Sequence, residues 1–257
     1  MVTVHQQLGI RHEDIHLTRE LLEILSAADH VVVNRLSSLK HLLEQGIGSV
    51  TFLHNPIPVH EYKKPIGIKH PQSSQSRKKV RCLFIGRLVE RRGPELALLA
   101  FEHALKRGVE SVLWIVGGGE LEMSLKNYVS SKGLTNSVKF FGNQSDVRRF
   151  LWNSDIYLAT SEIANSPSLA LREAMAAELA VIATDVEDTK TIIKQNDTGL
   201  LAHPDAHNIG LAIEKLVSDE KIRKRLGLAA AELVERKFDI RHYVKELLRV
   251  YKNTLQG

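Results

Sequence analysis

Short runs of apolar, often β-branched residues alternate with amphipathic segments of helical length, and this alternation constrains the fold more than any other feature of the chain. The most regular part has such runs near residues 80–85, 111–116, 137–141, 155–159, 180–184 and 199–201. The pattern is typical of parallel strands joined by crossover helices. It predicts a complete doubly wound α/β domain with a parallel sheet over residues 80–239.

A shorter stretch of the same alternation precedes this domain. Residues 2–5, 30–33 and 49–53 are predicted strands, and residues 17–27 and 38–44 are predicted helices. Three strands are few for a free-standing sheet. Residues 1–57 are therefore predicted to form a partial N-terminal, Rossmann-like domain. The last predicted helix, within residues 240–257, has an apolar face that must pack on another element. That face contains Val244, Leu247, Leu248 and Tyr251.

Residues 58–79 connect the two parts and concentrate the positive charge. The formal net charge is +5, and the Lys and Arg residues between 63 and 81 are offset only by Glu61. Because Pro, Gly, Ser and Gln are interspersed, this stretch is interpreted as a solvated basic linker. The alternative is a polybasic patch in weak contact with an anionic membrane surface. Nucleic-acid binding is not expected, since Tyr62 is the one aromatic residue and no nucleic-acid-binding motif is present.

Composition indicates a globular protein, because 43% of the 257 residues are hydrophobic, enough to bury a core. The single cysteine, Cys82, can form no internal disulfide and lies in an apolar run, which predicts a buried small side chain. No apolar stretch approaches the roughly 20 residues of a membrane-spanning helix, and residues 1–5 lack the charged start of a signal peptide. We therefore expect a cytoplasmic protein, soluble or peripheral at the inner membrane surface.

The predicted strand ends contain residues suited to a phosphorylated ligand, and ligands of open parallel sheets bind beyond these ends. In residues 86–93, glycines allow close approach of the backbone, and Arg87 and Arg92 could both reach a diphosphate. Residues 117–119 form a glycine turn that opens a helix. They lack the Gly-x-Gly-x-x-Gly spacing of a dinucleotide-binding fold, which argues against a dehydrogenase.

A further anion site is predicted where a helix begins near residue 167. Pro167 suits the first turn of a helix, with Ser166 as its N-cap. Exposed amides at a helix start favour an anion. The amides expected to point outward are those of Ser168, Leu169 and Ala170.

Glu173 lies within two turns of this helix start. A carboxylate in this position can accept two hydrogen bonds from a vicinal diol such as that of a ribose. The alternative interpretation is a favourable acidic charge near a helix N-terminus, with no ligand.

Taken together, these segments resemble the group 1 glycosyltransferases, family four of the retaining GT-B enzymes. The likeness covers nearly the whole chain and rests on several motifs in the right order. They are Phe84-Ile85-Gly86-Arg87-Leu88 with Arg92-Gly93, then residues 116–119, 138–142, 154–158, Glu173-Ala174-Met175-Ala176, 181–185 and 198–201.

The resemblance implies a GT-B fold and transfer of a sugar, with retention, from a nucleoside-diphosphate sugar to a glycan, lipid or small-molecule acceptor. It implies no metal and no other cofactor. Arg87 and Arg92 would act on the donor diphosphate as catalytic residues, Arg92 standing where the family usually has lysine. Glu173 matches the ribose-binding glutamate. The other implied donor-binding positions are Phe141 and Gly142 near the base, Leu169 and Ala170 near the phosphates, and Gly86, Ser168 and Asn165.

The N-terminal part resembles this family from midway onward. Residues 2–5 match the strand and histidine that face the transferred sugar, which makes His5 a candidate catalytic residue. The family's first strands and their glycine-rich loop have no counterpart, and the final helix resembles the one that braces the N-terminal domain. We therefore expect self-association, and slow transfer unless a complementing N-terminal polypeptide is supplied.

Several positions depart from the family pattern. Asn165 stands where the family has a glutamate that contacts the sugar. Glu178 and Ala180 replace a usual glycine and proline, and residues 187–188 replace small residues near the donor. These departures favour an alternative function, that of a truncated or non-catalytic nucleotide-sugar-binding or partner-binding homologue.

A second alternative comes from another enzyme class. His12-Glu13-Asp14-Ile15-His16 fits the H-E-x-x-H zinc pattern, with both histidines on one helical face. No third ligand and no cleft are recognisable beside it. A metalloprotease is therefore not favoured, and no bound zinc is expected.

Overall fold

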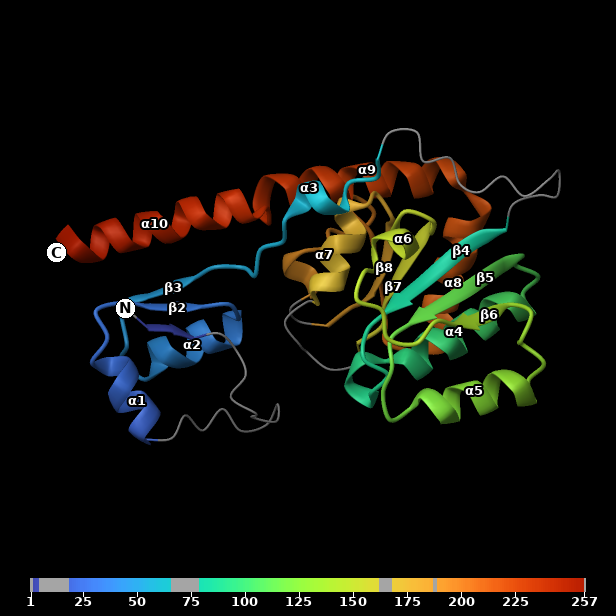
Figure 1. Ribbon diagram of the computed structural model, residues 1–257, viewed down its shortest axis with the longest axis horizontal. Helices are drawn as coiled ribbons and strands as arrows, with labels where there is room; N and C mark the ends of the chain where they lie inside the picture. The colour runs from blue at the N-terminus through green and yellow to red at the C-terminus, as the bar shows by residue number, and fades with distance from the viewer. Residues whose placement is uncertain (1, 5–18, 66–78, 162–167, 187–188, 257) are drawn as a thin grey trace. The chain divides into compact units, whose positions relative to one another are not determined.

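The protein's computed structural model describes residues 2–4, 19–65, 79–161, 168–186 and 189–256. They belong to two compact units: unit 1 combines Met1–Pro58 with Lys237–Gly257, and unit 2 is Val59–Arg236. Each unit has its own parallel sheet and its own helices (Figure 1).

Unit 2 is built on a six-stranded parallel sheet in the order β6-β5-β4-β7-β8-β9. The strands confirm the predicted ones, with small differences at their ends. Strands buried on both faces are typically near-continuous apolar runs, as in β8, all of whose residues are buried. The strands are β4 (Val80–Ile85), β5 (Ser111–Val116), β6 (Val138–Phe140), β7 (Ile156–Ala159), β8 (Ala180–Thr184) and β9 (Leu200–Ala202).

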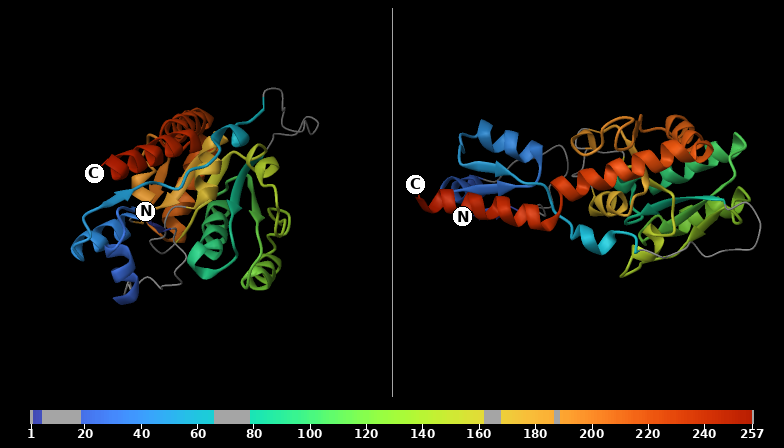
Figure 2. Two further views of the ribbon diagram at one scale, coloured as in Figure 1. Left: turned by 60° about the vertical axis from the view of Figure 1, so that its left-hand side comes forward. Right: turned by 90° about the horizontal axis from the view of Figure 1, so that it is seen from above.

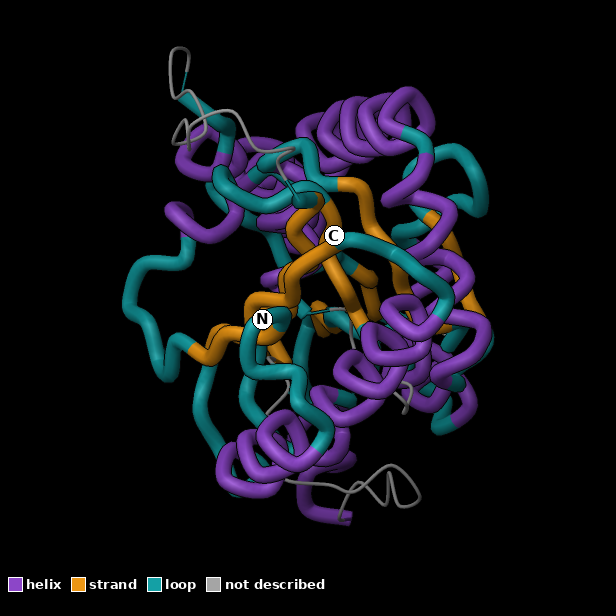
Figure 3. Tube along the Cα trace, turned by 90° about the vertical axis from the view of Figure 1, so that its right-hand side faces the viewer, coloured by secondary structure: helices purple, strands orange, loops and turns teal. Residues whose placement is uncertain are grey.

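Helices cover both faces of this sheet (Figure 3). In Figure 1, α4 and α5 lie below the sheet, and α9 lies above it. The core joins Cys82 of β4 and Ile182 of β8 to Phe101 of α4 and Ile213 of α8, and Cys82 is fully buried as predicted. The helices are α4 (Pro94–Lys106), α5 (Glu122–Ser131), α6 (Arg148–Leu151), α7 (Leu169–Ala176), α8 (Ala206–Ser218) and α9 (Glu220–Lys237), with short 3₁₀ turns η1 (Glu90–Arg92) and η2 (Thr189–Thr191).

The predicted linker, residues 58–79, begins with structure that the sequence interpretation missed. Helix α3 (Val59–Tyr62) packs on α7, and Val59 is only 1% exposed. The Trp152 indole Nε1–H donates a hydrogen bond to the backbone oxygen of Tyr62 (2.8 Å). The start of the stretch is therefore part of unit 2, since a buried valine and a tertiary hydrogen bond hold it there.

Unit 1 contains a small parallel sheet in the order β1-β2-β3. Its elements are β1 (Val2–Val4), α1 (Arg19–Ser26), β2 (Val31–Val33), α2 (Leu36–Glu44), β3 (Val50–Phe52) and α10 (Ile240–Gln256). A small core joins the sheet to helices α1 and α2. It consists of Leu25, Val31, Val33, Leu42 and Ile47. These elements confirm the predicted strands and helices.

Helix α10 is joined to unit 1 through its first turn. The amide of Ile57 donates to the Phe238 oxygen, and the amide of Ile240 donates to the Ile57 oxygen, each over 3.0 Å. The predicted amphipathic helix is present, and none of its described residues is fully buried, although Leu247 of the predicted apolar face is half-buried. Packing of this face toward the N-terminal domain remains a prediction. Figure 2 shows the whole length of this helix.

Candidate functional site

A hollow of about 210 Å³ opens at the carboxyl ends of β4 and β7. From β4 the chain continues to β5 and β6 on one side, whereas β7 leads to β8 and β9 on the other. Adjacent strands whose connections depart in opposite directions leave a crevice at their ends, where ligands of doubly wound sheets bind. The hollow is lined by Ile85, the last residue of β4, with Gly86 and Arg87 after it, and by Ala159, the last residue of β7, with Thr160 and Ser161 after it.

Two glycines bring the backbone segments around this hollow together. Gly93, between η1 and α4, has φ 65°, and a Cβ there would overlap the carbonyl of Thr160. The Thr160 hydroxyl donates to the Gly93 oxygen over 2.7 Å, which fixes the approach. Gly117 has φ 135°, and a Cβ there would overlap the Gly86 carbonyl. Only glycine tolerates both the positive φ and the close contact. These two glycines therefore allow the backbone segments around the hollow to approach each other closely.

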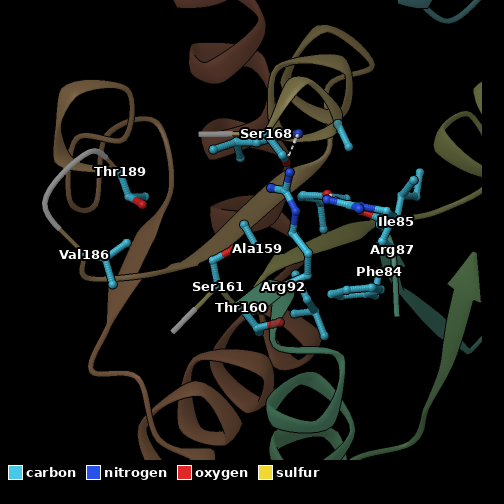
Figure 4. Close-up of a pocket in the computed structure, with 15 residues that line it drawn as sticks. Phe84, Ile85, Arg87, Arg92, Ala159, Thr160, Ser161, Ser168, Val186 and Thr189 are labelled. Atoms are coloured by element: carbon cyan, nitrogen blue, oxygen red, sulfur yellow. Dashed lines mark hydrogen bonds between the residues drawn. The ribbon is translucent and has the colours of Figure 1, made fainter. Parts of the chain in front are cut away.

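Arg87 and Arg92 both line the hollow, as the sequence predicted. Arg87 is exposed, whereas Arg92 is half-buried. Figure 4 shows the Arg92 side chain extending toward Ser168 at the start of α7. Burial lowers the pKa of Arg92, and the nearby Arg87 lowers it further, against the effect of Tyr157. Guanidinium remains charged in proteins, so this site holds concentrated positive charge suited to an anion.

The floor of the hollow includes Tyr157, which is 2% exposed. Its hydroxyl donates to the Ile85 oxygen over 3.2 Å. Burial raises the pKa of Tyr157, which a hydrogen bond with Ser168 partly opposes. The phenol is therefore a neutral group that ties the ends of β4 and β7 together.

Helix α7 begins later than predicted. Its N-cap is Ser168, not Ser166: the Ser168 hydroxyl accepts a hydrogen bond from the Leu171 amide over 3.3 Å. Leu169 and Ala170 are the first two helical residues, whose amides have no intrahelical acceptor. Ser168 and Ala170 line the hollow, so the helix start lies beside it with a shifted cap, and anion binding there remains a prediction.

Glu173 lies one turn further along α7 and is half-buried. Its Oε1 accepts a hydrogen bond from the Tyr62 hydroxyl over 3.0 Å. Burial raises the pKa of Glu173, and the hydrogen bond from Tyr62 lowers it. The pKa of Tyr62 itself is raised to about 12 by burial and by the neighbouring Glu173 carboxylate. Glu173 does not line the hollow but belongs to the same helix start.

The residues predicted to flank the base, Phe141 and Gly142, follow β6 and do not line the hollow. The Phe141 oxygen accepts from the Gln144 side chain over 2.7 Å, and the Gly142 oxygen accepts from the Gly117 amide over 2.8 Å. Both carbonyls are thus engaged within the protein. Their place beside a base remains a prediction.

The structure brings together Gly86, Arg87, Arg92, Ser168 and Ala170 at the hollow. Leu169 is 47% exposed and does not line it. His5 and Asn165 lie outside the described residues, as do His12 and His16 of the zinc pattern. Sequence interpretation missed other lining residues, although all of them lie within about five positions after two predicted strands, which is a usable signal. They are Thr160, Ser161, Val186 and Thr189.

Within the described part of the chain, no group of three or more His, Cys, Asp or Glu residues is placed to hold a metal ion. Among the same residues, no helix has the length and apolar character needed to cross a bilayer.

The family model of the group 1 glycosyl transferases matches residues 67–233. The chain belongs to this family. A curated relative, the lipopolysaccharide core biosynthesis glycosyltransferase LpsE of Rhizobium meliloti, is 30% identical over 56% of this chain and 41% of its own length. The phosphatidyl-myo-inositol mannosyltransferase of Mycobacterium leprae is 29% identical over 66% of this chain and 46% of its own length. The chain thus spans less than half the length of these glycosyltransferases.

Solved structures support the fold. The Anabaena protein HepE, crystallised in complex with UDP, superposes with a TM-score of 0.78 at 17% identity, over 93% of this chain and 69% of HepE. The G117R mutant of TarM from S. aureus superposes with a TM-score of 0.76 at 18% identity, over 90% of this chain and 45% of TarM. The predicted family and the predicted α/β, GT-B-like fold are confirmed.

Proposed function

We propose that this chain binds a nucleoside-diphosphate sugar at the crevice between β4 and β7 and takes part in transferring the sugar, with retained anomeric configuration. The observation that supports this most directly is the convergence of Arg87, Arg92 and the start of α7 on one hollow. Fixed positive groups aimed at a leaving diphosphate stabilise the charge that develops as the sugar departs. The UDP named with HepE is a ligand of this chemical class.

Each part of the proposed donor site follows from its chemistry. The two guanidinium groups bind the diphosphate with planar pairs of donors, and the amides of Leu169 and Ala170 add the positive end of α7. Glu173 accepts hydrogen bonds from the ribose hydroxyls. We propose that these groups stabilise the leaving diphosphate without a metal ion. The acceptor is proposed to be a glycan, a lipid or a small molecule.

The experiment that tests donor binding is calorimetry with UDP, GDP and ADP. We expect at least one of them to bind. Its 2′,3′-dideoxy analogue should bind more weakly, because it lacks the ribose hydroxyls that donate hydrogen bonds to Glu173. Glu173→Ala is expected to remove this ribose preference. The assignment is wrong if none of the three binds at millimolar concentration, or if Glu173→Ala keeps the preference.

Binding without turnover would favour the second candidate, a non-catalytic nucleotide-sugar-binding homologue. Asn165, in place of the family's usual glutamate, is the sequence feature that favours it. An assay for free nucleoside diphosphate released from donor sugars separates the two functions, because only a catalytic protein releases it. Adding EDTA to the same assay tests whether the release needs a metal ion.

A further inference from the structure

Tyr62 of α3 contacts the proposed donor site through Glu173, because its hydroxyl donates a hydrogen bond to the Glu173 carboxylate. It lies in the stretch that the sequence interpretation assigned to a linker. We propose that Tyr62 is a positioning residue for the nucleoside: its hydroxyl holds the Glu173 carboxylate in the orientation and the ionised state that bind the ribose diol. This inference rests on the proposed function of the crevice.

The Tyr62 hydroxyl is held in place independently of any ligand. Helix α3 is fixed on unit 2 by the buried side chain of Val59. The Trp152 indole fixes the backbone of Tyr62 through a 2.8 Å hydrogen bond to its oxygen. The Tyr62 to Glu173 distance of 3.0 Å is thus set by packing and by a second hydrogen bond. A hydroxyl with so few accessible positions is a suitable anchor for a carboxylate.

One anchored oxygen leaves the carboxylate with accepting capacity for the diol. An ionised carboxylate has about four acceptor positions on its two oxygens. Tyr62 uses one of them, on Oε1. Without the hydroxyl, Glu173 could rotate about its last bond, and its terminal torsion has broad preferences. Tyr62 therefore lowers the cost of ordering the carboxylate when a ribose binds.

The same contact affects the charge of Glu173. Burial raises the pKa of this carboxyl, and the Tyr62 hydroxyl opposes that effect by donating to the ionised form. Among the described residues, the other ionisable groups acting on this pair are Glu61 of α3, Arg148 of α6 and Tyr157 of β7. Removing the hydroxyl raises the pKa of Glu173. As the pH falls, a protein without the Tyr62 hydroxyl should therefore lose its preference for ribose at a higher pH than the wild-type protein does.

The decisive variant is Tyr62→Phe, which keeps the ring and removes the hydroxyl. The chain offers a matched control in Tyr128→Phe, because the Tyr128 hydroxyl donates to the Glu102 carboxylate between α5 and α4, neither residue lining the hollow. The measurement is the affinity ratio between the tightest binder among UDP, GDP and ADP and its 2′,3′-dideoxy analogue, by calorimetry from pH 5.5 to 8.5. Circular dichroism verifies that both variants are folded.

We expect Tyr62→Phe to reduce the ribose preference roughly tenfold, the size expected from loss of a hydrogen bond to a charged group. The loss should be largest at low pH, and Tyr128→Phe should keep the wild-type ratio and pH profile. An equal loss of affinity for the nucleotide and its dideoxy analogue would mean a general structural effect and overturn the proposal. Tighter nucleotide binding would mean that Tyr62 competes with the ribose, which also overturns it.

Failure of this inference differs from failure of the proposed function. If the wild-type protein binds a nucleotide and Glu173→Ala removes the ribose preference, while Tyr62→Phe changes neither the ratio nor the pH profile, then the donor site stands and Tyr62 has no positioning role. If the wild-type protein binds none of the three nucleotides, both are wrong.

Discussion

Arg92 is the residue that joins the two sides of the hollow. It extends from the η1 turn after β4 toward the cap of α7 and is half-buried, next to Arg87. Arginine's planar fork suits a diphosphate better than the point charge of lysine does. Burial also makes its charge less screened by solvent than that of the exposed Arg87. Arg92 should therefore contribute more to diphosphate binding than its neighbour.

Arg92→Ala is expected to weaken nucleoside diphosphate binding by about 2 kcal/mol, the size of a lost hydrogen bond to a charged group. Affinity for the nucleoside without phosphates should not change. Calorimetry with both ligands measures this difference. Arg91→Ala is the control, since Arg91 is exposed and does not line the hollow. Equal losses for nucleoside and nucleotide would show that Arg92 supports the fold instead of binding phosphate.

At the scale of elements, the start of α7 has two roles that substitutions can separate. The Ser168 hydroxyl caps the helix by accepting from the Leu171 amide, and the same residue lines the hollow. An N-cap side chain stabilises a helix, whereas a negative charge beside the hollow would repel a diphosphate. Stability and ligand binding therefore respond differently to the choice of capping residue.

We expect Ser168→Ala to lower the free energy of unfolding by about 1 kcal/mol. Ser168→Asp should keep that stability and still weaken nucleoside diphosphate binding at least tenfold. Urea unfolding and calorimetry measure the two effects. Asp205→Ala is the control, because Asp205 caps α8 by accepting from the Asn208 amide (2.8 Å) and lies outside the hollow. It should lose stability only. Unchanged binding in Ser168→Asp would place the phosphates away from α7.

At the scale of the whole molecule, α10 presents an apolar stripe. Ile240, Val244, Leu248, Tyr251 and Leu255 recur at helical spacing and are 41%, 47%, 54%, 42% and 84% exposed. A contiguous exposed apolar surface of this kind favours association with another protein surface. We propose that it causes this chain to self-associate when it is produced alone.

Light scattering after size-exclusion chromatography should show an oligomer whose population rises with protein concentration. Leu248→Glu is expected to shift it toward the monomer, because a charge within the stripe would have to be buried. The matched control is Leu228→Glu on α9, at a residue 52% exposed and outside the stripe. A wild-type chain that is monomeric at all concentrations would contradict the expectation, as would equal effects of the two variants.

The alternation of apolar runs and helical segments was enough to predict the architecture of unit 2 and the polar residues at its strand ends. Apolar runs such as 80–85 and 180–184 were predicted as buried parallel strands because they are short, rich in β-branched residues and separated by segments of helical length that can cover both faces. Arg87 and Arg92 could be assigned because the end of a parallel strand fixes where the following residues lie. Both inferences depend on a local pattern of residues, which can be read directly from the sequence.

Contacts between residues far apart in the chain depend on tertiary packing, which the sequence pattern does not reveal. The contact between Tyr62 and Glu173 spans 111 positions, and nothing in the composition of residues 58–79 distinguishes a packed turn from a solvated linker. The choice of Ser168 over Ser166 as the cap depends on where α7 begins against the sheet, since both serines have equal intrinsic preference. The exposed stripe of α10 could not be predicted for a similar reason. Periodicity shows that one face of a helix is apolar, but it does not identify the element, if any, that buries this face.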